Sequence, residues 1–106
     1  MIFDFSEFSL EFSEPHYMEM ELNGCSDIDL NIICKEGRFY AWFFSIDSIM
    51  EMLNSADYGR NYFRCAGLIV VHRVELNIII RTIKNIYQDS KGNLSKFFPE
   101  IINGNN

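Results

Sequence analysis

Two pairs of carboxylates in this chain have a spacing that points to chemistry. One apolar residue separates Glu19 from Glu21, and one separates Asp27 from Asp29. Residues two apart on a strand point to the same face of a sheet, so each pair is expected to share a face. Carboxylate oxygens bind Mg²⁺ or Ca²⁺, and they also accept hydrogen bonds from the cationic side chains of other proteins. The spacing is therefore consistent with either a metal site or a protein-binding surface.

The surroundings of these carboxylates do not favour a metal site. A calcium loop has the form DxDxDG with a distal Glu, and residues 26–32 match only its first half, without the glycine. Cys25, Cys34 and Cys65 form no CxxC pair, whereas zinc requires four closely placed ligands. We therefore expect no metal and no cofactor. An odd number of unpaired cysteines predicts reduced thiols in a cytoplasmic protein.

No pattern in the chain predicts an enzyme. The two histidines, His16 and His72, lie in no HExxH-type motif, and the sequence contains neither GxSxG nor GxxxxGK[ST]. His16 follows Pro15 and is interpreted as an exposed turn residue, and His72 as a strand-end residue with a local partner. We expect a protein without catalytic activity.

The charges are unevenly distributed along the 106 residues. Residues 1–57 carry twelve carboxylates and two bases, whereas residues 58–106 carry three carboxylates and seven bases, which gives the net charge of −6. An acidic chain is a poor nucleic-acid partner, because phosphate contacts need basic surface. Apolar runs such as 66–71 and 78–80 fall far short of the ~20 residues of a membrane helix, so no membrane partner is expected. The N-terminus lacks the basic region of a secretory signal peptide.

The first half of the chain has the alternation of half-buried strands. Segments 8–13, 18–22 and 27–32 alternate apolar and polar residues, and segment 39–44 is apolar on both faces. Turn residues separate them at 13–16, at Asn23-Gly24 and at 35–38. These features predict an antiparallel β-meander with one acidic face.

The second half contains the predicted helices. Ser45 is expected to cap a helix whose apolar stripe is Ile46, Ile49, Met50 and Leu53, and residues 68–71 are expected to form a buried strand. Residues 76–88 fit both a helical stripe and an alternating strand; their length favours a helix that ends at 90–93. A short turn is expected within 94–102. No linker separates the two charge halves, so we predict one α+β domain over 1–106, with about five strands packed against one to three helices as a single pair of layers.

Aromatic residues beside the acids favour a binding surface. Alternation does not bury every ring of the run 39–44 on one layer, so some of Tyr40, Trp42 and Phe44 are expected on the acidic side. Trp and Tyr dominate binding hot spots. A solvated face kept soluble by its charge is the plainer interpretation, and the sequence leaves both open. The predicted partner-binding residues are Glu11, Glu19, Glu21, Asp27, Asp29, Tyr40 and Trp42.

Taken together, Glu19-Met20-Glu21, Asp27-Ile28-Asp29 and the aromatic run 39–44 give a small acidic protein that resembles the immunity proteins of bacterial contact-dependent inhibition and other polymorphic toxin systems. The resemblance implies a non-enzymatic cytoplasmic inhibitor that binds a cognate toxin domain, often a basic nuclease, and blocks its active site. It transfers no functional residue by position, because these families differ in fold.

Two alternatives remain at this point. One is an interaction module, such as a homodimer in which the acidic half of one copy meets Arg73, Arg81 and Lys84 of another. The other is a small enzyme or divalent-metal binder, which calorimetric titration with Ca²⁺, Mg²⁺ and Zn²⁺ would test.

Overall fold

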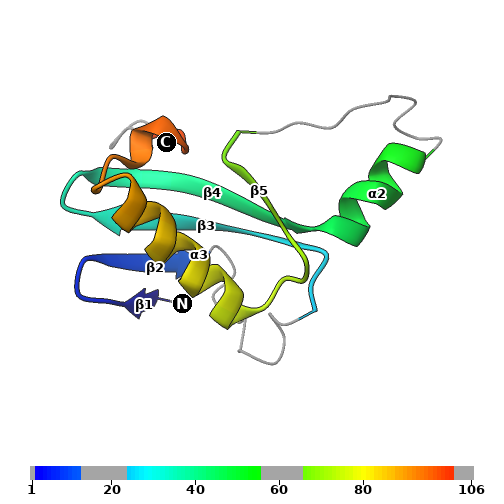
Figure 1. Cartoon of the computed structure of the whole chain (residues 1–106), viewed down its shortest axis with the longest axis horizontal. Helices are drawn as coiled ribbons and strands as arrows, with labels where there is room; N and C mark the ends of the chain where they lie inside the picture. Colours follow the sequence, from blue (N-terminus) through cyan, green and yellow to red (C-terminus); the bar gives the residue numbers. More distant parts are fainter. Residues whose placement is uncertain (1, 13–23, 56–65, 102–106) are drawn as a thin grey trace.

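The protein folds as a mixed β-sheet with α-helices, shown by a computed structural model that describes residues 2–12, 24–55 and 66–101 (Figure 1). The sheet order is β1-β2-β3-β4-β5. The strands are β1 (Ile2–Asp4), β2 (Phe8–Phe12), β3 (Asp27–Cys34), β4 (Gly37–Ser45) and β5 (Leu68–Val71). The helices are α2 (Ile46–Asn54), α3 (Leu76–Asp89) and the 3₁₀ helix η1 (Leu94–Lys96). The predicted α+β class is confirmed.

The prediction of a wholly antiparallel meander is wrong for the last strand. Strands β1 to β4 pair antiparallel with their neighbours, but β5 pairs parallel with β4. The chain passes through α2 between these two strands, and such a crossover lets the second strand run in the same direction as the first. The predicted strand 18–22 lies outside the described residues, as do Glu19, Glu21, His16 and Cys65. Strand β1 was not predicted.

Local sequence signals explain the ends of the central elements. Lys35 and Glu36 form the predicted tight turn, because Cys34 pairs with Gly37 across the hairpin of β3 and β4. Ser45 caps α2 as predicted: its Oγ accepts the backbone N–H of Ser48 at 3.2 Å. Helix α3 ends at the predicted stop, where Lys91 has φ 55° and Gly92 has φ 83°.

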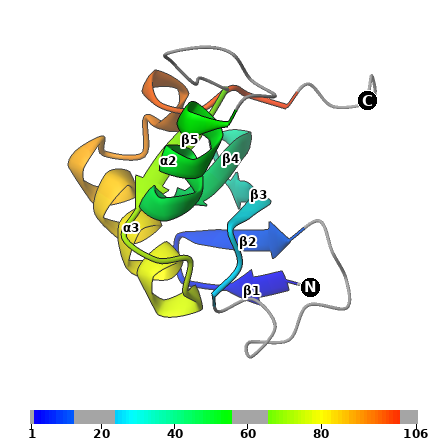
Figure 2. The same cartoon turned by 90° about the vertical axis from the view of Figure 1, so that its right-hand side faces the viewer.

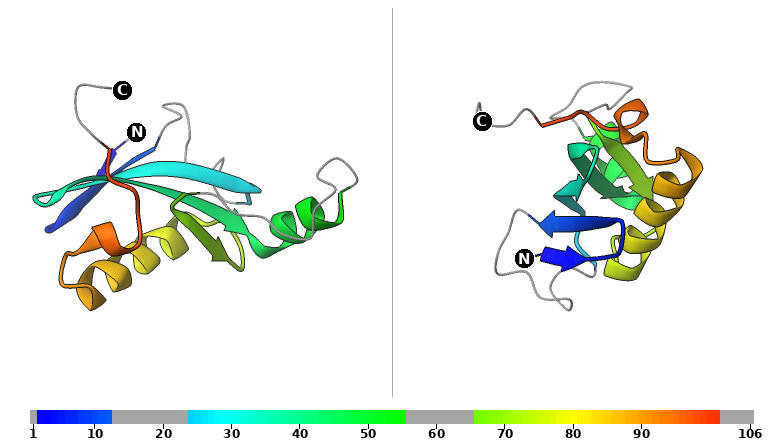
Figure 3. Two further views of the ribbon diagram at one scale, coloured as in Figure 1. Left: turned by 90° about the horizontal axis from the view of Figure 1, so that it is seen from above. Right: turned by 90° about the vertical axis from the view of Figure 1, so that its left-hand side faces the viewer.

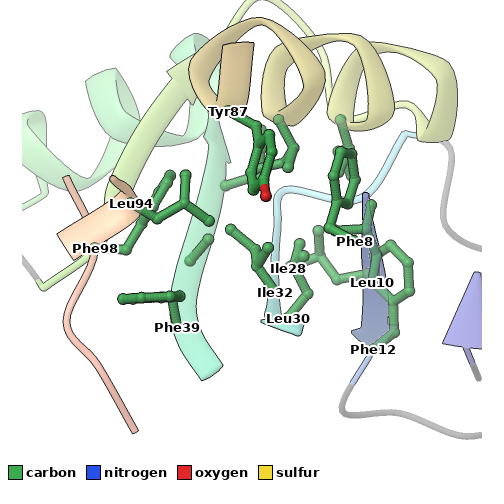
Figure 4. Packing of buried hydrophobic residues seen from close by; sticks show 14 of the residues in the cluster. Phe8, Leu10, Phe12, Ile28, Leu30, Ile32, Phe39, Tyr87, Leu94 and Phe98 are labelled. Atoms are coloured by element: carbon green, nitrogen blue, oxygen red, sulfur yellow. The ribbon is translucent and has the colours of Figure 1, made fainter. Parts of the chain in front are cut away.

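Alternate residues of the strands form the core on one face of the sheet, called here the inner face (Figure 4). Side chains of α3 and η1 pack onto it from the second half of the chain, so the acidic and basic parts of the sequence share one core. Helix α3 lies on this side of the sheet along the strands (Figure 3). The fully buried large side chains are Leu10, Leu30, Ile32, Phe43, Val74, Ile79, Ile83 and Leu94.

Helices α2 and α3 are packed very differently. In α3 the predicted stripe is buried at Leu76, Ile79, Ile83 and Tyr87, which settles residues 76–88 as helix. Helix α2 lies against β4 and β5 at one end of the sheet (Figure 2), and Ser48 is its buried residue. Within the described ranges, no helix is both long and apolar enough to cross a membrane.

The sequence overstated the burial of α2 and β5. Ile46 and Met50 of the predicted apolar stripe are 44% and 55% exposed. Strand β5 is the last strand in the sheet order rather than an internal one, and Val70 is 45% exposed. Alternation and apolar runs report the type of element, whereas burial depends on what packs against it.

Candidate functional site: the outer face of the sheet

Five of the seven predicted site residues lie on the sheet face opposite α3, called here the outer face. Their neighbours along the strands are buried on the inner face, and strand side chains alternate between faces. The strand register places Glu11 on β2 opposite Asn31 on β3, and Asn31 opposite Tyr40 on β4. The structure thus brings Glu11, Asp27, Asp29, Tyr40 and Trp42 together, while Glu19 and Glu21 lie outside the described residues.

Aromatic donors on β4 hold the two aspartates of β3. The Tyr40 hydroxyl donates a hydrogen bond to Asp29 Oδ2 at 3.1 Å, and Trp42 Nε1 donates to Asp27 Oδ2 at 2.7 Å. Trp42 is directly opposite Asp29 in the register, so both bonds run diagonally to the neighbouring pair, within reach of long side chains. We call these four residues the aromatic–carboxylate ladder. Each hydrogen bond orients its carboxylate on the outer face.

The rings of the ladder continue into a third aromatic residue. The ring centroids of Tyr40 and Trp42 are 6.3 Å apart with planes at 68°, and those of Trp42 and Phe44 are 5.0 Å apart at 41°. Phe39 and Phe43 of the same strand are buried on the inner face. The run 39–44 therefore contributes side chains to both faces. The rings that carry polar groups, Tyr40 and Trp42, lie on the outer face.

Glu11 differs from the two aspartates because a base of the protein pairs with it. Arg38 Nη2 lies 2.9 Å from Glu11 Oε1, and Asn31 Nδ2 donates to the same oxygen at 3.1 Å. This pair is partly exposed, with 42% and 33% of the two side chains accessible. Sequence reasoning missed Arg38, although its position at the start of the strand that carries Tyr40 and Trp42 places it on the same face. Among the described residues, no Lys or Arg forms an ion pair with Asp27 or Asp29.

A groove of about 350 Å³ opens where the ladder meets α2, called here the corner groove. The start of α2 is fixed beside β3, because Ser48 Oγ donates to the carbonyl of Ser26 at 3.0 Å. Sequence reasoning missed Glu51. The pattern that could have indicated it is a helix that begins directly at the end of a strand of the acidic face. The groove is lined by Asp27 of β3, Trp42 and Phe44 of β4, and Ser48, Glu51 and Met52 of α2.

At the opposite end of the sheet, Tyr87, Glu36 and Cys34 form a hydrogen-bond network and do not form a reactive site. The Tyr87 hydroxyl donates to Glu36 Oε1 at 3.1 Å, and burial and this carboxylate raise the pKa of Tyr87 to about 12. Burial raises the pKa of the Cys34 thiol, so it is protonated at neutral pH and unsuited to nucleophilic attack. Burial opposes ionisation of Glu36, but hydrogen bonds from Cys34 and Tyr87 lower its pKa below the ordinary value.

Of the remaining candidate groups, His72 and Cys25 line one pocket of about 290 Å³ beside the start of α2, whereas Cys34 lies at the other end of β3. His72 follows β5 and is exposed, and Cys25 and Cys34 are half-buried. Among the described residues, no three His, Cys, Asp or Glu side chains are grouped closely enough to hold a metal ion. No protein-family model, curated protein or solved structure matches this chain.

Proposed function

We propose that this protein is a non-enzymatic immunity protein, which binds and neutralises a basic, nuclease-type toxin domain through the outer face of its sheet. The observation that carries the proposal is the aromatic–carboxylate ladder, in which Trp42 and Tyr40 hold the carboxylates of Asp27 and Asp29 on one face. A partner of this kind would be met in the cytoplasm.

The electrostatics of the face support a basic partner. A toxin site that grips RNA or DNA is positively charged, and fixed carboxylates can occupy the places of phosphates. Complementary charge raises association rates from about 10⁵–10⁶ toward about 10⁸–10⁹ M⁻¹s⁻¹ at low salt. An inhibitor that must capture its toxin quickly gains directly from such a field.

The aromatic residues support a protein partner over a purely solvated face. Tyr40 and Trp42 are half-buried, so part of each ring remains accessible beside the acids. Tyr and Trp are the residues most enriched in binding hot spots, because they offer a large rigid surface with a polar edge. Charge would guide the encounter, and the rings would supply the contact area.

The geometry gives less support to the homodimer alternative. Arg81 and Lys84 are exposed on α3, which covers the inner face, while the acids lie on the outer face. Contact between α3 of one copy and the outer face of the next is head-to-tail. It leaves one binding surface free at each end, so the assembly does not close at two copies. Sedimentation at low and high salt tests this: a salt-sensitive closed dimer would favour the alternative.

The test of the proposed function compares two matched charge reversals. Asp29→Lys places a positive charge on the ladder, and Asp89→Lys makes the same change at the exposed end of α3. The probes are the toxin C-terminal domains of the host, including any that is encoded beside the gene, with binding followed at two salt concentrations and protection followed by co-expression. We expect Asp29→Lys to slow association about tenfold or more and to weaken its salt dependence.

The control variant should bind as the unaltered protein does. Equal affinity and equal salt dependence of the two variants would reject the outer face as the binding site. Failure of every such toxin domain to bind would reject the immunity function itself.

A further inference from the structure

The corner groove combines an aromatic wall with carboxylates. The indole of Trp42 packs beside the ring of Phe44, with centroids 5.0 Å apart. Asp27 contributes a half-buried carboxylate and Glu51 an exposed one, and no Lys, Arg or His of the described chain lines the groove. A site of this composition selects a cation with an apolar or planar body.

The indole and the carboxylate are held in one arrangement. Trp42 Nε1 donates to Asp27 Oδ2 at 2.7 Å, so the edge of the ring points at the carboxylate. A planar group stacked on the indole face would bring its own N–H edge toward that carboxylate, which has lone pairs for further donors. Guanidinium has this shape: it is planar, carries five donors and stacks on aromatic faces.

The rest of the groove suits the stem of such a side chain. Met52 contributes a flexible thioether, which adapts to irregular apolar surfaces. A volume of about 350 Å³ lies at the small end of ligand pockets, which suits one side chain rather than a large ligand. We propose that the corner groove binds an arginine side chain of the partner protein, with its guanidinium stacked on the Trp42 indole face and its N–H groups toward the carboxylates of Asp27 and Glu51. This inference rests on the proposed function, because it names the group of the basic partner that enters the acidic face.

The chain supplies its own reporter for the test, because Trp42 is its only tryptophan. The probe is N-acetyl-arginine amide, compared with N-acetyl-citrulline amide, which has similar size but no charge, and with N-acetyl-lysine amide. Binding is followed by tryptophan fluorescence and by the NMR resonance of the indole N–H. We expect a saturable change with the arginine amide, a weaker one with the lysine amide and none with the citrulline amide.

A matched pair of charge removals places the binding at the groove. Glu51→Gln should weaken arginine-amide affinity up to about fivefold, the range of exposed ion pairs. Glu100→Gln makes the same change beside Gly37, at the other end of β4, and should leave the affinity unaltered. Equal responses to arginine and citrulline amides, no arginine response, or equal affinities of the two variants would overturn the proposal.

The two proposals fail separately. If a toxin domain binds in an Asp29-dependent manner while the arginine amide gives no response, the groove assignment is wrong and the outer face stands. If the arginine amide binds but no toxin domain does, the immunity function is wrong and the guanidinium selectivity of the groove stands.

Discussion

The inner and outer faces of the sheet are built from the same strands but held together by different interactions. On β3, Ile28, Leu30 and Ile32 are buried under α3, whereas Asp27 and Asp29 lie half-buried on the outer face. The inner face gains stability from apolar area removed from water, about 25 cal/mol per Å². The outer face is organised by hydrogen bonds, each of which contributes a net of only about 0.5–1.5 kcal/mol.

This difference indicates where sequence can change at low cost to the fold. Substitutions on the inner face leave cavities, whereas those on the outer face exchange one partly solvated hydrogen bond for another. The outer face can therefore carry a charge pattern suited to a partner while the inner face maintains the structure.

Adjacent isoleucines on β3 provide the strongest test of this comparison. Ile32 is fully buried on the inner face, and Ile33 is half-buried on the outer face. We expect Ile32→Ala to lower the free energy of unfolding by about 2–5 kcal/mol, because it leaves a cavity under α3. Ile33→Ala should lower it by about 1 kcal/mol or less. Urea unfolding measures both, and equal losses would contradict the assignment of the faces.

Two tyrosine–carboxylate pairs with equal oxygen–oxygen distances sharpen the comparison. Tyr87 bonds Glu36 on the covered side and Tyr40 bonds Asp29 on the outer face, both at 3.1 Å. We expect Tyr87→Phe to lower the free energy of unfolding by about 1 kcal/mol, and Tyr40→Phe by a few tenths, because Tyr87 is buried whereas water reaches the half-buried Tyr40 and compensates its lost hydrogen bond. Urea unfolding at neutral pH measures the difference, and a larger loss for Tyr40→Phe would contradict it.

The Tyr87 pair also predicts a pH dependence. The pKa of Tyr87, about 12, lies above the ordinary value of 10.0, so the folded protein holds the phenol proton more tightly than the unfolded chain. This contribution to stability is complete below pH 10 and decreases as the pH rises from 10 to 12. Between pH 9 and 11, Tyr87→Phe should therefore lose less stability than the unaltered protein. Parallel losses in the two proteins would show that Tyr87 titrates normally.

Local pattern was sufficient to predict much of the fold. The alternation of β2 and β3, the apolar run of β4, the cap at Ser45 and the stripe of α3 depend on neighbours within a few residues, and all appear in the structure. Strand β1 has three residues, too few for a period to be recognised. The parallel direction of β5 depends on the path of the chain through α2 and on pairing with β4, which local pattern does not encode.

The site was predictable to the extent that strand alternation determined it. Alternation placed Asp27 and Asp29 on one face, and it predicted that some of Tyr40, Trp42 and Phe44 share that face. The pairing of Arg38 with Glu11 joins residues 27 apart in sequence, and it follows only once the register of three strands is known. The entry of Glu51 into the corner groove likewise depends on how α2 is oriented against the end of the sheet.

A small, salt-dependent effect is expected from repulsion within the ladder. Asp27 and Asp29 are two residues apart on β3, or roughly 7 Å, at which distance two like charges repel by about 0.6 kcal/mol in water. Asp29→Asn keeps an oxygen that can accept the Tyr40 hydrogen bond but removes this repulsion. A double-mutant cycle with Asp27→Asn isolates the coupling of the pair. We expect an unfavourable coupling of about 0.6 kcal/mol at low salt, which disappears near 1 M salt, where screening extends over about 3 Å.

Urea unfolding of the four proteins at both salt concentrations measures this coupling. A basic partner would relieve the same repulsion on binding. A measured repulsion would therefore link the stability of the free protein to the affinity of its outer face for that partner. A coupling of zero, or one unchanged by salt, would mean that the two carboxylates do not interact electrostatically. The ladder would then offer a partner two separate hydrogen-bond acceptors, and the advantage in association rate attributed to the outer face would be lost.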